Sequence, residues 1–266
     1  MSVSDSRKRR SLPSVSSSLA LLSALRYEQS DPDRFYRLLA EDTADIIQPY
    51  INYDGKLVLE VGSGPGDLSE AIRARGGKVL AVDRSWEEIH CRRRSLESVA
   101  IADGCLLPVR DGTFDLVCSS NVLEHVPTPS SMVSEMIRVA RPGGIIYFNY
   151  TTWLSPFGGH ETSPWHFFGG RWAAARYTRK NGHPPKNFYG ESLFPVGVRT
   201  FRKMLAREID GIVVVDMFSR YLPRWLNLAV RVPILSELST LNLAVVMCKK
   251  DPAVRSENNH ESMLAR

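Results

Sequence analysis

The residues most suited to chemistry begin at a glycine-rich turn, Gly62-Ser63-Gly64-Pro65-Gly66, which follows a short apolar run at residues 57–61. Glycine allows a backbone turn to approach a ligand at a distance that a Cβ atom would prevent. The spacing departs from the dinucleotide fingerprint G-x-G-x-x-G/A, because the third small position counted from Gly62 is Asp67. The turn therefore favours a ligand other than a dinucleotide, although any tight strand-to-helix turn can use glycine.

Two carboxylates at the ends of the next two apolar runs strengthen this interpretation. Asp83 ends the run at 78–83, and Asp103 follows the run at 99–101. A carboxylate can accept hydrogen bonds from both hydroxyls of a ribose, and each such bond contributes about 1.5–3 kcal/mol. Asp103 is placed to accept a hydrogen bond from the exocyclic amine of an adenine. The alternatives are a helix cap at Asp83 and a turn former at Asp103-Gly104, but together with the glycine turn the two acids indicate a nucleoside without phosphate.

The elements that must position these residues alternate between strand and helix. Apolar runs predict strands near 57–61, 78–83, 99–101, 114–119 and 145–151, with helices between them. Five alternations predict parallel strands joined by right-handed crossovers, with helices on both faces of the sheet. Ligands of such sheets bind beyond the carboxyl ends of the strands, which is where the glycine turn and both acids fall.

Further segments complete a single predicted domain over residues 19–250. Its expected parts are a helix at 32–48, the alternating core at 57–151, an insertion at 152–195, a helix at 197–208, strands at 212–217 and 243–249, and an amphipathic insertion at 218–241. Residues 1–18 and 251–266 are polar and charged, and we expect disordered tails there.

The 152–195 insertion carries the candidate catalytic groups. A long loop inside a compact domain is usually functional, and this one directly follows the fifth strand. His160, Glu161 and His166 lie close together among Gly and Trp, and imidazole or carboxylate groups can act as a general base toward a hydroxyl. The alternative is a lid packed by Trp165 and Phe167, with its histidines bonded to backbone.

Composition limits the partners and the compartment. Four basic groups lie within residues 1–10, so the rest of this +5 chain is nearly neutral. The nearly neutral charge of the chain after residue 10 predicts no contact with DNA and disfavours binding of RNA. The four cysteines form no CxxC pair, and no run of about 18 apolar residues predicts a membrane span, so we expect a cytoplasmic protein. Residues 222–232 have apolar helical spacing, which leaves open a peripheral membrane contact, a cover over the cleft, a dimer face, or core packing.

With these motifs in this order, the chain resembles the class I S-adenosylmethionine-dependent methyltransferases, specifically the type 11 family. The matching motifs are V-L-E-V-G-S-G-P-G at 58–66, V-D at 82–83, A-D at 102–103, F-D-L-V at 114–117, S-N-V-L-E-H-V at 120–126 and R-P-G-G at 141–144. The resemblance implies a doubly wound, Rossmann-like α/β sheet of five parallel strands plus a C-terminal antiparallel hairpin, in the order 3-2-1-4-5-7-6. The chain with its insertion also looks like actinobacterial members of uncharacterised function.

The resemblance also implies the role of each residue at the site. Glu60, Gly62 and Gly64 would surround the methionine part of S-adenosylmethionine, Asp83 the ribose, and Asp103 with the Gly104 amide the adenine. Asn121 would face the methyl donor through its backbone. Ser63 and Gly66 belong to the same implied cofactor turn.

Two sub-family motifs can be compared with the segment after the fourth strand. The N/D-P-P-Y/F motif of nucleic acid and protein amine methylases is absent, because Ser119-Ser120-Asn121-Val122 occupies its place. The metal-binding E-x-x-E-H motif lacks its first acid, because the segment reads Asn121-Val122-Leu123-Glu124-His125. Glu124 and His125 with His160 or His166 could form a depleted Mg²⁺ or Zn²⁺ site, but three good ligands are the minimum. We therefore expect no metal and interpret 123–126 as a structural corner.

These observations predict an S-adenosylmethionine-dependent methyltransferase that acts on a small or lipid-like acceptor, with oxygen as the expected target atom. The alternatives are an RNA methyltransferase and a cofactor-binding protein that has lost catalysis. Asp67 and Asp103 disfavour a further alternative, an NAD-dependent oxidoreductase.

Overall fold

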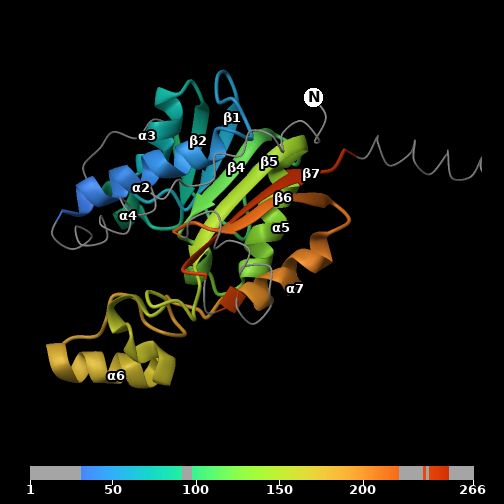
Figure 1. The fold of residues 1–266 in the computed structure, drawn as a ribbon. Helices are drawn as coiled ribbons and strands as arrows, with labels where there is room; N and C mark the ends of the chain where they lie inside the picture. The colour runs from blue at the N-terminus through green and yellow to red at the C-terminus, as the bar shows by residue number, and fades with distance from the viewer. Residues whose placement is uncertain (1–30, 92–97, 222–235, 238–239, 252–266) are drawn as a thin grey trace, which may run out of the picture.

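A seven-stranded mixed sheet forms the centre of the computed structural model, which describes residues 31–91, 98–221, 236–237 and 240–251 (Figure 1). The strand order is β3-β2-β1-β4-β5-β7-β6, which confirms the predicted doubly wound sheet with its C-terminal hairpin. The strands are β1 (Leu57–Val61), β2 (Lys78–Asp83), β3 (Val99–Ile101), β4 (Phe114–Ser120), β5 (Ala140–Thr151), β6 (Ile212–Ser219) and β7 (Asn242–Lys249). Strands β1 to β5 pair in parallel, and β7 runs antiparallel to both of its neighbours.

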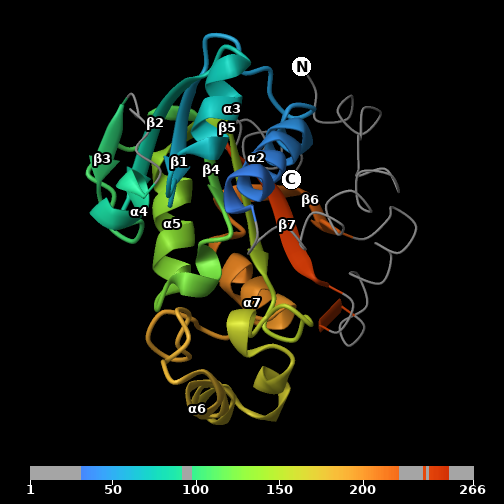
Figure 2. The same ribbon diagram turned by 90° about the vertical axis from the view of Figure 1, so that its left-hand side faces the viewer.

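Helices cover both faces of this sheet (Figure 2). On one face, α2 (Pro32–Ile47) and α3 (Asp67–Ala74) contribute to one buried apolar cluster. On the other face, α5 (Pro129–Val139) and α7 (Val198–Glu208) contribute to a second cluster. Because both faces are covered, β4 and β7 bury nearly every side chain, which explains why their sequences are apolar without alternation. The short helix α4 (Trp86–His90) connects β2 toward β3.

A buried ion pair joins helix α2 to the end of the edge strand β6. Arg220, just after β6, is fully buried and donates two hydrogen bonds to one Asp42 carboxylate oxygen at 2.7 and 3.0 Å. It also donates to the Leu39 carbonyl and the Thr43 hydroxyl, both at 2.8 Å. A buried guanidinium requires such partners, so this contact fixes where α2 lies on the sheet.

The 152–195 insertion folds into a lobe beyond the end of β5, and so at the carboxyl edge of the parallel strands (Figures 1 and 2). It contains the 3₁₀ helices η4 (His160–Thr162) and η5 (Trp165–Phe168), and α6 (Gly170–Asn181). The sequence did not predict α6. The only side chains that α6 buries are Ala173 and Ala174, besides Gly170, so it lacks the apolar periodicity from which helices are predicted.

Strand β5 also differs from the prediction, because it begins at Ala140 rather than near 145. Its register with β4 shifts between Phe114–Ala140 and Leu116–Ile145. Gly143, with a φ of 73°, lies within this irregularity. A bulge of this kind accommodates R-P-G-G inside a strand.

Several predictions concern residues that the structure does not describe. They are the tails at 1–18 and 252–266 and the amphipathic segment at 222–232, and all of them remain predictions. The described part of the chain contains no helix with the length and apolar character needed to cross a membrane.

Candidate active site

The glycine turn after β1 is held against the end of β2. The amides of Gly62 and Ser63 donate to the Val82 carbonyl at 2.8 and 3.1 Å, and the Gly64 amide donates to Asp83 Oδ2 at 2.8 Å. Gly62, Gly64 and Gly66 have φ values of 76°, 49° and 85°. Residues with a Cβ adopt such angles at a cost of about 1–2 kcal/mol, so the conformation itself explains the three glycines.

Both carboxylate oxygens of Asp83 accept hydrogen bonds from backbone amides, one of them in the glycine turn. Oδ2 accepts from Gly64, and Oδ1 accepts from the Ser85 amide at 2.9 Å. Each carboxylate oxygen has two lone pairs, so Asp83 keeps acceptor capacity toward a ligand. The cap of α4 is Ser85, whose hydroxyl accepts from the Glu88 amide at 3.1 Å. Asp83 is therefore free of the capping role that was its alternative.

Asp103 lies at the same edge of the sheet, just past β3. The Ala102 amide donates to the Asp83 carbonyl at 3.0 Å, which ties the two strand ends together. Asp103 is exposed, and its Oδ1 accepts from the Cys105 amide at 2.9 Å. A Cβ on Gly104 would lie 2.9 Å from Val61 Cγ1, so this loop packs closely beside the glycine turn.

Glu60 is the buried carboxyl of the site. It is 3% exposed, and the Ser69 hydroxyl of α3 donates to its Oε2. Burial penalises the charged form and raises the Glu60 pKa to about 8, although the bond from Ser69 acts in the opposite direction. A neutral carboxyl in this position would gain a partner, and lose its proton, when a cationic group binds beside it.

Asn121 follows β4 in a left-handed conformation, with a φ of 55°. Its side-chain oxygen accepts from Asn149 Nδ2 at 3.1 Å and from Asn242 Nδ2 at 2.8 Å. The next residue, Val122, lies so close to the glycine turn that a Cβ on Gly62 would be 2.4 Å from it. Sequence reasoning missed Asn149 and Asn242, because nothing in a strand sequence marks a side chain that supports a distant loop.

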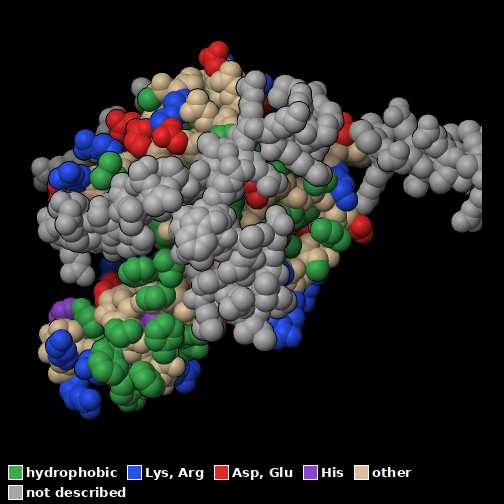
Figure 3. Space-filling view, in the orientation of Figure 1, with side chains coloured by type: hydrophobic (Ala, Val, Ile, Leu, Met, Phe, Trp, Pro, Cys, Tyr) green, Lys and Arg blue, Asp and Glu red, His purple; other side chains and the backbone are tan. Residues whose placement is uncertain are grey.

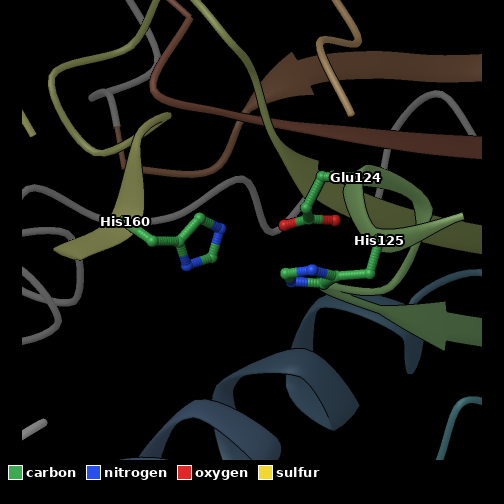
Figure 4. Close-up of side chains that lie close together, drawn as sticks. All are labelled: Glu124, His125 and His160. Atoms are coloured by element: carbon green, nitrogen blue, oxygen red, sulfur yellow. The ribbon is translucent and has the colours of Figure 1, made fainter. Parts of the chain in front are cut away.

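The 3₁₀ helix η3 (Leu123–His125) and the lobe bring three polar side chains together (Figure 4). They are Glu124, His125 and His160, and one ligand atom from each lies within 4.8 Å of the other two. Burial lowers the His160 pKa to about 4, although the nearby Glu124 acts in the opposite direction. The ring of His160 is therefore neutral at physiological pH.

The other two candidate catalytic residues lie apart from this cluster. His166 is buried, and its Nε2 donates to the carbonyls of Trp153 and Ser155 at 3.0 and 3.1 Å. These bonds are the backbone contacts expected of a packed lid, which was the alternative interpretation, and a catalytic role of His166 stays a prediction. Glu161 accepts from Asn187 Nδ2 through Oε1 at 3.0 Å, and its buried Oε2 has no hydrogen-bond partner.

Comparison with known proteins identifies the family to which the chain belongs. Residues 59–148 match the methyltransferase domain family. A protein of Mycobacteroides abscessus, described as an uncharacterised methyltransferase, is 42% identical over 243 residues that cover 86% of this chain and 93% of the relative. A Mycobacterium tuberculosis relative with the same description is 41% identical over 260 residues, which cover 93% of this chain and 99% of the relative.

The chain belongs to the methyltransferase family. The fold agrees, because the S-adenosylmethionine-dependent methyltransferase of Mesorhizobium loti superposes with a TM-score of 0.51 at 18% identity, over 74% of this chain and 93% of that one. The chain is thus a methyltransferase, as the sequence predicted.

The strand ends of this methyltransferase fit S-adenosylmethionine on physical grounds. A Cβ on Gly64 would meet nothing within 4 Å, so the turn opens onto space beside the Asp83 carboxylate. Glu60 gives this edge a buried carboxyl that a cation would stabilise. S-adenosylmethionine carries such a cation and supplies an activated methyl group.

Proposed function

We propose that this methyltransferase transfers the methyl group to an oxygen of a lipid-like acceptor, which enters between the carboxyl edge of the sheet and the lobe. The observation that carries the proposal is the surface of the lobe (Figure 3). Phe168 is 75% exposed, and its ring lies 6.1 Å from Trp172 and 6.2 Å from Trp165. Exposed aromatic clusters of this kind usually mark a binding surface.

Charge on the lobe supports an amphipathic and anionic partner. Residues 152–195 contain five Lys and Arg against two Glu. The Arg176 guanidinium lies 4.0 Å from the centre of the Trp165 ring, so cationic and aromatic groups are interleaved. Aromatic rings with adjacent basic groups suit the boundary between acyl chains and anionic headgroups.

The cofactor residues keep the roles that the resemblance implies. In the proposal, Asp83 accepts the ribose hydroxyls, Asp103 and the Gly104 amide hold the adenine, and Glu60 faces the cationic methionine part. The turn residues Gly62, Ser63, Gly64 and Gly66 and the backbone of Asn121 line the space for the methyl donor. Orientation of the two reacting partners supplies as much as about 7–11 kcal/mol of the barrier reduction.

We assign the acceptor's proton to Glu161 on η4, at the start of the lobe, whose buried Oε2 has no hydrogen-bond partner in the described structure. A hydroxyl oxygen that receives a methyl group becomes an oxonium, which is a far stronger acid than an imidazolium. Even a weak base such as a carboxylate can therefore accept that proton as the new bond forms. Glu161→Gln is therefore expected to lower turnover while S-adenosylmethionine binding persists.

The test is transfer of a labelled methyl group from S-adenosylmethionine into a mycobacterial cell extract, followed by separation into lipid, small-molecule, RNA and protein fractions. We expect label in the lipid fraction, and none with the Asp83→Ala variant. Label in RNA instead would support the RNA alternative. Binding of S-adenosylmethionine without label in any fraction would support an inactive cofactor-binding protein.

A further inference from the structure

Three potential metal ligands from two distant segments converge at the carboxyl edge of the sheet (Figure 4). Glu124 and His125 come from η3, and His160 comes from η4 in the lobe. Their ligand atoms all lie within 4.8 Å of one another, and the two imidazole rings are 5.1 Å apart. The state of each donor atom decides whether this cluster is a site or a packing arrangement.

Glu124 presents one fixed and one unsatisfied oxygen. Its Oε1 accepts from the Thr151 amide at 3.0 Å, while Oε2 is buried and has no hydrogen-bond partner. The whole residue is 1% exposed. An unpaired buried carboxylate oxygen is costly, so its retention calls for a ligand.

The ring of His125 is oriented by Ser192, which lies near the C-terminal end of the lobe. Its Nδ1 lies 2.7 Å from the Ser192 carbonyl, and since a carbonyl only accepts, Nδ1 carries the proton. The lone pair is therefore on Nε2. Fixing of one ring nitrogen by a carbonyl is the usual outer arrangement around a metal-bound histidine. The Phe194 amide also donates to the Glu124 carbonyl at 2.8 Å, so the same segment holds both residues.

His160 reaches the cluster in a backbone conformation that few side chains adopt. Its φ is 47°, and its Nε2 is buried without a hydrogen-bond partner. Such strained residues collect at ligand sites, where the surrounding structure enforces the geometry. Each of the three residues thus brings a donor atom to the cluster, and on Glu124 and His160 a buried atom has no partner in the described structure.

We propose that Glu124, His125 and His160 bind a divalent transition-metal ion of the Zn²⁺ type. Two imidazoles and one carboxylate suit Zn²⁺ better than Mg²⁺, which prefers oxygen ligands throughout. A tetrahedral ion with bonds of about 2.1 Å places its ligands about 3.4 Å apart, so the present spacing needs only small inward movements of the side chains. The proposal departs from our expectation of no metal and adopts the alternative site of Glu124, His125 and His160 that the sequence left open.

The site does not depend on the identity of the acceptor, and its test needs no methyl transfer. Untagged protein, stripped with a chelator and dialysed, is titrated with Zn²⁺ alone against a chromogenic chelator. We expect one ion per chain in the parent. Glu124→Gln and His160→Ala are expected to bind at least tenfold more weakly.

The matched control is His183→Ala, which removes an exposed histidine of the same lobe. This variant should bind Zn²⁺ as the parent does. Zn²⁺ should also raise the midpoint of thermal unfolding of the parent and of the control, but not of Glu124→Gln or His160→Ala, because only ions that bind the folded state stabilise it. Both site variants should remain folded, since they change buried polar groups without creating large cavities.

Substitution with Co²⁺ gives an independent reading of the ligand set, because its visible absorption reports nitrogen and oxygen coordination in a low-symmetry site. The parent should show these bands and His160→Ala should lose them. Stoichiometric binding that is unchanged in both site variants would overturn the proposal, as would an absence of Zn²⁺ binding by the parent. Failure of methyl transfer to lipid would leave these measurements unaffected.

Discussion

At the scale of single residues, burial makes Glu60 a proton-linked group at the cofactor edge. Its pKa is raised to about 8, so the free protein holds it neutral near pH 7. A cationic ligand favours the carboxylate, and binding therefore releases a proton. S-adenosylmethionine affinity should rise with pH below 8, by up to about tenfold per pH unit.

Isothermal titration in buffers of different ionisation enthalpy measures both the affinity and the proton release. The titrations should cover about pH 5.5 to 7.5, because the α-amino group of the ligand itself titrates near 7.7–8.0. Glu60→Gln cannot ionise and should bind with an affinity that is flat over this range. A parent protein with equally flat affinity would exclude Glu60 from contact with the cationic part of the cofactor.

Position along the chain was enough to predict that Asp83 and Asp103 lie at the same edge of the sheet. Asp83 and Asp103 end predicted parallel strands, and such ends necessarily meet at one edge of a sheet. The sequence could not predict in the same way that His160 lies beside Glu124. Their proximity depends on how the lobe folds, and its turns, such as the left-handed backbone at His160, leave no periodic pattern in the sequence.

At the scale of elements, strands and capped helices were predictable where apolar periodicity and capping residues agree. Asp31 caps α2, and its carboxylate accepts from the Arg34 amide at 3.2 Å. Helix α6 escaped prediction because its exposed face carries Trp172 and three arginines, while its inner face is built from alanine. Propensity without an apolar stripe does not distinguish such a helix from a loop.

The turn between β1 and α3 allows folding and cofactor binding to be separated by a matched pair of substitutions. Gly62 and Gly64 both have positive φ, so alanine costs about 1–2 kcal/mol of backbone strain at either position. At Gly62 the new Cβ would also lie 2.4 Å from Val122, whereas at Gly64 it would meet nothing within 4 Å.

Gly62→Ala should therefore lower the unfolding midpoint clearly more than Gly64→Ala does. Gly64→Ala places its Cβ in the space assigned to the cofactor, and should weaken S-adenosylmethionine binding at least tenfold while the protein stays folded. Calorimetric unfolding and titration of both variants check this. Normal cofactor binding by Gly64→Ala would remove the turn from the proposed site.

At the scale of the whole molecule, the parallel strands followed from the alternation of strand and helix, and the strand order from the family resemblance. The anchoring of α2 followed from neither. Arg220 and Asp42 are far apart in sequence, and an isolated arginine after a strand carries no signal of burial. Removing one partner of a buried ion pair costs about 3–5 kcal/mol, whereas exposed pairs contribute about 0–1 kcal/mol.

Arg220→Met should lower the free energy of unfolding by about 3–5 kcal/mol in denaturant titration, because it leaves the Asp42 carboxylate without its cation. The control is Arg75→Met, which removes a partly exposed arginine that pairs with Glu41 and Asp45, each at 2.7 Å. Its effect should stay within about 1 kcal/mol. Equal effects of the two substitutions would show that α2 is held by its apolar face alone.

The lobe gives the molecule a surface that the sheet and its helices do not provide. If its aromatic and basic groups contact an acyl-chain boundary, the protein should co-sediment with vesicles that contain phosphatidylglycerol, and less so as salt rises. Burying one aromatic ring contributes about 1.5–3 kcal/mol, so the double variant Phe168→Ala/Trp172→Ala should weaken vesicle binding at least tenfold. Trp86→Ala on α4 removes a similarly exposed ring outside the lobe and should have no effect. Equal binding by all three proteins would separate the lobe from lipid and, with it, remove the main support for a lipid-like acceptor.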